Sequence, residues 1–230
     1  MSVSKKNKCD LNTCSMCLGC RPEWMSAIDA NRKMLHFKKG DRLFIEGDPV
    51  IGMYFIYSGL VKVHKQWGDD KELIVRFAKQ GAIVGHRGLG TDTIYPVSAT
   101  ALSTTEICFV DLGFFIATLK VNDQYLFDLM MFFASELKES ERRMRNLAHM
   151  STKGRIGQAL LTLQGKFGVT SDGLINIDIS RQDLASYSGT TYETLFKMLN
   201  EFVEENLINL NGKSIRIVDQ KGLVKYSAER

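Results

Sequence analysis

The chain has 230 residues, of which 44% are hydrophobic, and a formal net charge of +4 at pH 7. This length accommodates one large or two small domains, and the composition is that of a folded soluble protein. No apolar run approaches the length that spans a bilayer and no apolar signal segment opens the chain, so we expect a cytoplasmic protein without a membrane partner. The mildly basic charge permits nucleic-acid binding without requiring it.

Four of the five cysteines lie in the first 22 residues: Cys9, Cys14, Cys17 and Cys20. The last three form a C-x2-C-x2-C run, which lets a short backbone segment present several thiolates to one site, as in ferredoxin motifs. Cys108, in a predicted strand, supplies a distant thiolate. We therefore predict an iron–sulfur cluster, with zinc or thiols without a ligand role as alternatives; the odd number of cysteines argues against a disulfide framework.

Residues 1–22 are polar, cysteine-rich and without hydrophobic periodicity, so we expect this N-terminal arm to fold only around a ligand. Residues 23–121 follow, and from residue 34 short runs of Phe, Ile, Val, Tyr and Leu alternate with glycine turns such as Lys39-Gly40-Asp41. Short strands at regular intervals, separated by turn signals, predict a β-barrel or sandwich.

Residues 122–149 change character, because no Gly or Pro occurs between 123 and 148 and apolar residues recur at helical spacing. This pattern predicts one long helix. Much of it is too apolar for a lone surface helix, so we expect one face to pack on the β-domain and another to pair with a second copy. The candidates for that pairing include Met130, Phe133 and Met144.

Residues 150–230 are predicted to be helical with a small β tail. The predicted elements are a helix over 153–167, a strand over 175–179, two further helices, and a hairpin over 208–218 with Asn211-Gly212 at its centre. Ten Lys plus Arg against nine Asp plus Glu leave residues 151–230 nearly neutral. Any DNA contact there must come from a local patch.

The two further helices have the pattern of a helix–turn–helix. Ser180 suits the N-cap of the first helix, Gly189 the positive φ of a tight turn, and Thr190 or Thr191 the cap of the second helix. The hairpin that follows would form a wing, which makes an ordinary helical hairpin less probable than a DNA-reading motif.

The second of these helices is available for a major groove. Glu193 can accept a hydrogen bond from cytosine N4, and Lys197 can reach a guanine edge or a phosphate. Ser180 and Arg181, at the start of the preceding helix, suit phosphate contacts. The groove-facing candidates are Thr191, Tyr192, Glu193, Phe196 and Lys197.

A cysteine-rich arm, a glycine-punctuated β-domain, a long helix and a winged helix–turn–helix, in this order, resemble the Crp/Fnr family of bacterial transcription regulators. The most specific match is Arg181-x3-Ala185-x3-Gly189-x3-Glu193-x3-Lys197. The resemblance covers essentially the whole chain. It implies an α+β fold with an N-terminal β-roll of the cyclic-nucleotide-binding type. It also implies a homodimer that is not an enzyme, binds palindromic double-stranded DNA and contacts RNA polymerase.

Within the family the chain looks like the Fnr branch, which senses oxygen with a [4Fe–4S] cluster held by three N-terminal cysteines and one in the β-roll. The segment Ala101 to Cys108 matches the one that carries the distant ligand. Because the N-terminal spacing is tighter than in the best-known Fnr branch, Cys9 stays open as an alternative ligand. The ligands implied by the resemblance are Cys14, Cys17, Cys20 and Cys108.

The resemblance also places Leu137 and Ser140 at the dimer interface. Fnr has an acidic residue where Ser140 stands, and repulsion there helps make its dimerisation depend on the cluster. We therefore expect the electrostatic repulsion that opposes dimerisation to be weaker here, although Glu136, Glu139 and Glu141 lie close by.

The Crp branch binds cyclic AMP through a glutamate and an arginine that this chain lacks. The matching positions hold His86 and Tyr95. A phosphate without its arginine loses a charge-assisted pair, so we predict no cyclic-nucleotide binding and expect His86 to be a surface histidine.

The sequence thus predicts an oxygen-responsive transcription regulator in which the cluster orders the arm near Cys108 and biases the long helix toward pairing. Two recognition helices would then read a palindrome of roughly 14–16 base pairs. One alternative is a regulator of the same fold that senses nitric oxide or peroxide through the cluster or through thiols. Another is an iron–sulfur electron-transfer protein, against which the winged helix–turn–helix argues.

Overall fold

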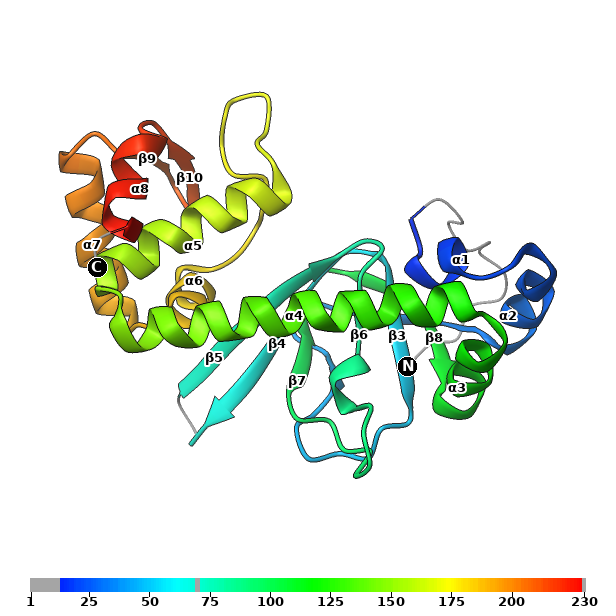
Figure 1. Ribbon diagram of the computed structural model, residues 1–230. Helices are drawn as coiled ribbons and strands as arrows, with labels where there is room; N and C mark the ends of the chain where they lie inside the picture. Colours follow the sequence, from blue (N-terminus) through cyan, green and yellow to red (C-terminus); the bar gives the residue numbers. More distant parts are fainter. Residues whose placement is uncertain (1–12, 69–70, 229–230) are drawn as a thin grey trace. The chain divides into compact units, whose positions relative to one another are not determined.

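The computed structural model describes residues 13–68 and 71–228 (Figure 1). Cys9 lies outside the described residues. The chain divides into two compact units, Met1–Glu136 and Leu137–Arg230. The division falls within a single long helix, α4 (Asp123–His149), which confirms the helix predicted for this stretch. None of the helices in the described residues is long and apolar enough to span a membrane.

The first unit contains two four-stranded antiparallel sheets, as the glycine-punctuated pattern predicted. Their strand orders are β1-β8-β3-β6 and β2-β7-β4-β5. The strands are β1 (Lys33–Phe37), β2 (Arg42–Phe44), β3 (Gly52–Ser58), β4 (Leu60–Trp67), β5 (Lys71–Lys79), β6 (Ile83–Val84), β7 (Ser98–Ala101) and β8 (Thr105–Asp111). Cys108 lies on β8 between β1 and β3, opposite Met34 and Phe55, and is buried.

Helices gather at one end of this unit (Figure 1). They are α1 (Ser15–Gly19), the 3-10 turn η1 (Pro22–Trp24), α2 (Met25–Asn31) and α3 (Leu112–Val121), and a second 3-10 turn, η2 (His86–Gly88), follows β6. Helix α1 was not predicted, because its segment has no hydrophobic periodicity. Its Met16 is fully buried and its cysteines pack as small apolar side chains, so the helix is held by tertiary packing.

The second unit contains α5 (Thr152–Phe167), α6 (Arg181–Ser188), α7 (Tyr192–Glu204), a hairpin of β9 (Ile208–Asn211) and β10 (Ser214–Ile217), and α8 (Gln220–Ala228). The predicted α5, the helix pair and the hairpin are confirmed. The hairpin turn is Gly212-Lys213, one residue later than predicted, because Asn211 pairs with Ser214.

The strand predicted over 175–179 was wrong. Only Ile175 makes an isolated bridge, to Val169, and its amide donates to the carbonyl of Ile215. Alternating isoleucines indicate a half-buried extended segment, but a β-strand also needs a neighbouring strand to which it can hydrogen-bond along its length. Helix α8 was not predicted; it packs against α5, and its Leu223 is fully buried.

Candidate functional site

The helix–turn–helix is capped as its sequence predicted. Ser180 caps α6 in a reciprocal capping box, since its hydroxyl accepts from the Asp183 amide and the Asp183 carboxylate accepts from the Ser180 amide. Gly189 ends α6 in the left-handed conformation, at φ 64°. Thr191 caps α7 by accepting a hydrogen bond from the Thr194 amide. The turn between the two helices is therefore set by local chemistry.

Helix α7 separates a buried face from an exposed one. Leu195, Leu199 and Phe202 are buried in the core of the second unit. The opposite face includes a large apolar side chain, Phe196, that is 57% exposed, which is unusual unless the face meets a partner. All five groove-facing candidates are exposed: Thr191, Tyr192, Glu193, Phe196 and Lys197.

The two residues predicted to contact phosphate are already engaged within the fold. The Ser180 hydroxyl donates to the Asp183 carboxylate at 2.5 Å. The Arg181 guanidinium donates to the Gly212 carbonyl in the hairpin turn at 3.1 Å. Arg181 thus links the first helix of the motif to the wing, a contact across 31 residues that the sequence did not indicate.

The long helix α4 carries exposed apolar side chains at heptad spacing. Met130, Leu137 and Met144 recur every seven residues and are 53%, 61% and 64% exposed. Ser140 is also exposed. Phe133 differs, because it is half-buried against the β-roll core with its ring edge-on to His86. A seven-residue apolar repeat is the pattern by which helices pair.

The cysteines of the arm lie in and beside the short helix α1. Cys17 is within the helix, Cys14 and Cys20 flank its two ends in extended conformation, and all three are buried. They belong to the same hydrophobic core cluster as Cys108. All four cysteines predicted as ligands are therefore buried in the core of the first unit.

The surroundings of these thiols are apolar. Burial, together with a smaller effect of negative charge on Cys14, raises the pKa of Cys20 to about 12. Burial raises the pKa of the Tyr125 hydroxyl at the start of α4 well above its ordinary value, and negative charge on Cys14, Cys20 and Cys17 adds to this effect. Across residues 13–68 and 71–228, no group of three or more Cys, His, Asp or Glu side chains is arranged to hold a metal ion.

The arm is bonded to the junction of α3 and α4. The Arg21 amide donates to the Asn122 side chain at 2.8 Å, and the Arg21 guanidinium lies 2.6 Å from the Asp123 carboxylate. The Trp24 indole donates to the Thr118 hydroxyl at 3.1 Å. These contacts connect the cysteine segment to the first residues of α4, and sequence reasoning did not find them.

Gly81, after β5, is where the β-roll meets Thr13 of the arm. Its φ is 84°, and a Cβ there would lie 2.5 Å from the Thr13 carbonyl oxygen. We expect Gly81→Ala to displace the arm and to increase hydrogen exchange of the α1 amides. Gly40→Ala is the matched control, since Gly40 has φ 92° with no neighbour within 4 Å and carries the same backbone strain alone. Equal α1 exchange in both variants would contradict this packing.

The two residues that the resemblance aligns with the nucleotide-binding glutamate and arginine of the Crp branch, His86 and Tyr95, are both buried. His86 is 2% exposed, so the prediction of a surface histidine was wrong. It packs edge-on to Phe132 and Phe133, and burial lowers its pKa to about 3, which keeps it neutral. Tyr95 is buried and its hydroxyl donates to the Gly52 carbonyl at 2.9 Å.

Glu136 of α4 joins the helix to two arginines of the β-roll. Its carboxylate lies 2.7 Å from Arg87 and 3.2 Å from Arg76. Burial alone would raise the pKa of Glu136, but the two guanidiniums outweigh it and hold the pKa below its ordinary value. This ion cluster attaches α4 to β5 and η2.

We expect Glu136→Gln to destabilise the protein by roughly 3 kcal/mol at pH 7, because it leaves the buried Arg76 without its counter-ion. Since the folded pKa of Glu136 is depressed, the carboxylate contributes stability above its unfolded pKa and loses it as pH falls through the folded pKa. Denaturation at pH 7 and in mild acid checks this. A variant that matches the wild type at pH 7 would show that the ion cluster adds no net stability.

Two family models match the chain, a cyclic nucleotide-binding domain over residues 34–122 and a Crp-like helix-turn-helix domain over residues 154–226. The chain is 27% identical to the transcriptional activator protein FnrA of Stutzerimonas stutzeri, across 94% of this chain and 89% of that protein. It is 24% identical to a CRP-like cAMP-activated global transcriptional regulator of Mycobacterium tuberculosis, across 90% and 93%. The structure of FixK2 from Bradyrhizobium japonicum matches with a TM-score of 0.77 at 21% identity, across 86% of this chain and 98% of that one.

A β-roll, a long helix and a winged helix–turn–helix in this order define a DNA-binding regulator with a separate sensor domain. The chain belongs to the Crp/Fnr family of transcription regulators. Members of this family bind DNA and are not enzymes, in agreement with the absence of a catalytic constellation in the sequence.

Proposed function

We propose that this chain is a cytoplasmic transcription regulator whose DNA binding responds to oxygen through a [4Fe–4S] cluster held by Cys14, Cys17, Cys20 and Cys108. The observation that supports the proposal is the burial of all four cysteines in the core of the first unit, with Cys17 in α1 and Cys14 and Cys20 at its two ends. Their thiols are the donors that an iron–sulfur cluster requires.

The donor set fits such a group, although the four thiols must converge to bind it. Cys9, five residues before Cys14 in the sequence, is the alternative fourth ligand. Zinc is the alternative metal. When bound, the cluster supplies an oxygen-sensitive centre. The chain itself supplies the buried site and the connection from that site to α4.

The connection consists of the bonds from Arg21 to Asn122 and Asp123. A change in the position of the cysteine segment must break these bonds or move the first turn of α4. Helix α4 in turn carries the exposed heptad repeat through which we propose that two chains pair. A redox change at the arm can therefore alter the proposed dimer interface through the bonds between Arg21 and the start of α4.

In the paired state, two copies of α7 would read the two halves of a palindromic DNA site, with Glu193 and Lys197 at base edges. Ser180 and Arg181 would lie near the phosphates. RNA polymerase is the expected protein partner. A relative from Bacillus subtilis that is named anaerobic regulatory protein supports oxygen as the signal, whereas the name of the M. tuberculosis relative indicates cAMP.

The β-roll argues against cAMP for this chain. By the resemblance, His86 and Tyr95 stand where the Crp branch has its ribose-binding glutamate and its phosphate-binding arginine, and both are buried. Arg76 and Arg87 are paired with Glu136, so a phosphate bound by either arginine would have to compete with this carboxylate. We therefore propose that residues 34–122 have the fold of a cyclic nucleotide-binding domain but do not bind a cyclic nucleotide.

The test is purification without oxygen, with an absorbance spectrum and analysis of iron, sulfide and zinc, followed by DNA binding before and after exposure to air. We expect a coloured protein with equal iron and sulfide that loses both its colour and its DNA affinity in air. A colourless anaerobic protein that contains zinc would refute the cluster. A cluster that survives air but responds to nitric oxide would identify the other signal.

A further inference from the structure

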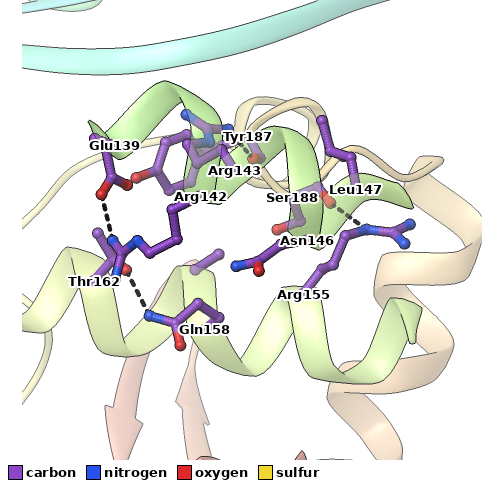
Figure 2. A pocket seen from close by; sticks show the side chains of 11 residues that line it. Glu139, Arg142, Arg143, Asn146, Leu147, Arg155, Gln158, Thr162, Tyr187 and Ser188 are labelled. Carbon is purple, nitrogen blue, oxygen red and sulfur yellow. Dashed lines mark hydrogen bonds and ion pairs between the residues drawn. The ribbon is translucent and has the colours of Figure 1, made fainter. Parts of the chain in front are cut away.

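The C-terminal end of α6 is held by two arginines from neighbouring helices. Arg143 of α4 donates to the Tyr187 carbonyl at 2.8 Å, and Arg155 of α5 donates to the Ser188 carbonyl at 3.2 Å (Figure 2). Arg155 also donates to the Gly189 carbonyl at 3.2 Å. These are three successive carbonyls at the end of a helix, where the backbone offers no further intrahelical partner. The arginines therefore occupy the three carbonyls that lead directly into the turn of the helix–turn–helix.

Both contacts are electrostatically favourable, because the carbonyl end of a helix carries partial negative charge. The Arg143 guanidinium also lies 4.5 Å from the centroid of the Tyr187 ring, which adds a cation–π contact. Arg155 donates a third backbone bond to the Met150 carbonyl at 3.0 Å. It thereby joins the α4–α5 junction to the turn between α6 and α7.

We propose that Arg143 and Arg155 are positioning residues for DNA recognition, which fix the direction of α7 relative to the pairing helix. The turn is only three residues long, from Gly189 to the cap Thr191, so a displacement of its first residue is passed directly to α7. The inference rests on the proposed pairing of two chains through α4. In such a dimer, the direction of α7 sets the distance between half-sites.

The neighbouring Arg142 provides a matched control. It lines the same small cavity, of about 40 Å³, but its guanidinium bonds to Glu139 of its own helix at 2.5 Å (Figure 2). No hydrogen bond from Arg142 to a carbonyl of α6 is found among the described residues. Arg142→Gln and Arg143→Gln therefore remove the same charge from adjacent positions, and only the second releases the turn.

The experiment uses full-length protein purified without oxygen, and DNA selected by the wild type from a random double-stranded library. Affinity is measured at the selected half-site spacing and with one base pair added or removed. We expect Arg143→Gln to lose about tenfold in affinity at the selected spacing and to flatten the preference among spacings. Arg142→Gln should change the affinity at all three spacings by the same small factor, and Arg143→Lys should recover part of the loss.

A wild-type spacing preference in Arg143→Gln would overturn the proposal. Hydrogen exchange provides a second readout that needs no DNA, because the Gly189 and Thr190 amides both donate to the Ala185 carbonyl. Their exchange should accelerate in Arg143→Gln and not in Arg142→Gln, with α5 unchanged. If the wild type selects no palindromic site, the proposed function fails, but hydrogen exchange still tests the role of Arg143. Equal exchange of the Gly189 and Thr190 amides in Arg143→Gln and Arg142→Gln would then overturn the inference.

Discussion

Replacing Cys108 by serine should give a colourless protein under anaerobic purification, with iron and sulfide at background level. A serine hydroxyl stays protonated near neutral pH and does not replace a thiolate as a cluster ligand. Cys108 is held on β8 between β1 and β3, so no neighbouring residue can take its place by a small shift. DNA binding should then be equally weak with and without oxygen. Iron analysis and anaerobic DNA binding measure both effects.

Two companion variants separate ligand loss from damage to the fold. Cys108→Ala avoids burying a new hydroxyl, so its thermal unfolding should stay closer to that of the wild type than that of Cys108→Ser. Cys9→Ser should keep the cluster. If instead Cys108→Ser stays coloured and Cys9→Ser does not, the fourth ligand is Cys9 and the contribution of β8 is wrong.

Glu193→Gln should relax base preference at one position of each half-site. Glu193 is exposed in the first turn of α7, and as an acceptor facing cytosine N4 it would contribute about 1–3 kcal/mol of discrimination per half-site. The amide can accept or donate, so discrimination falls. Binding to DNA of unrelated sequence should not weaken, because the substitution removes a charge that repels phosphate. Competition with single-base variants of the selected site measures this.

Glu204→Gln is the control, because it removes the same charge from the exposed last turn of the same helix, about 16 Å away along the axis. It should leave base preference unchanged. If both variants change affinity in the same way at every site sequence, Glu193 acts only through its charge. In that case α7 does not read a base at this position.

Features governed by short-range chemistry were predicted well from the sequence. The caps Ser180 and Thr191 and the left-handed Gly189 fix the ends of α6 and α7, because each satisfies backbone groups within three or four residues. Helix α4 was also predicted correctly, because its 26 residues from 123 to 148 contain no Gly or Pro that would interrupt a helix. The strand over 175–179 failed because strand formation depends on a partner that its own residues do not specify.

The tertiary structure alone revealed which residues meet across long sequence separations. Arg21 and Asn122 are 101 residues apart, and nothing in either segment predicts their bond. His86 looked like a surface residue because polar composition near a loop gives no information on the helix α4 that covers it. The contacts of Arg143 and Arg155 with the end of α6 were missed for the same reason, because each arginine lies on another helix.

The sequence by itself therefore determined the order of the elements, the winged helix–turn–helix and the four cysteines as candidate ligands. Spacing, capping and composition are local properties, and local interactions select local structure. Only the tertiary structure decided that these cysteines are buried in the core of the first unit, that their segment is bonded to the start of α4, and that His86 is buried near the ion cluster of Glu136. Those outcomes depend on how separate elements pack, and packing is a property of the whole unit.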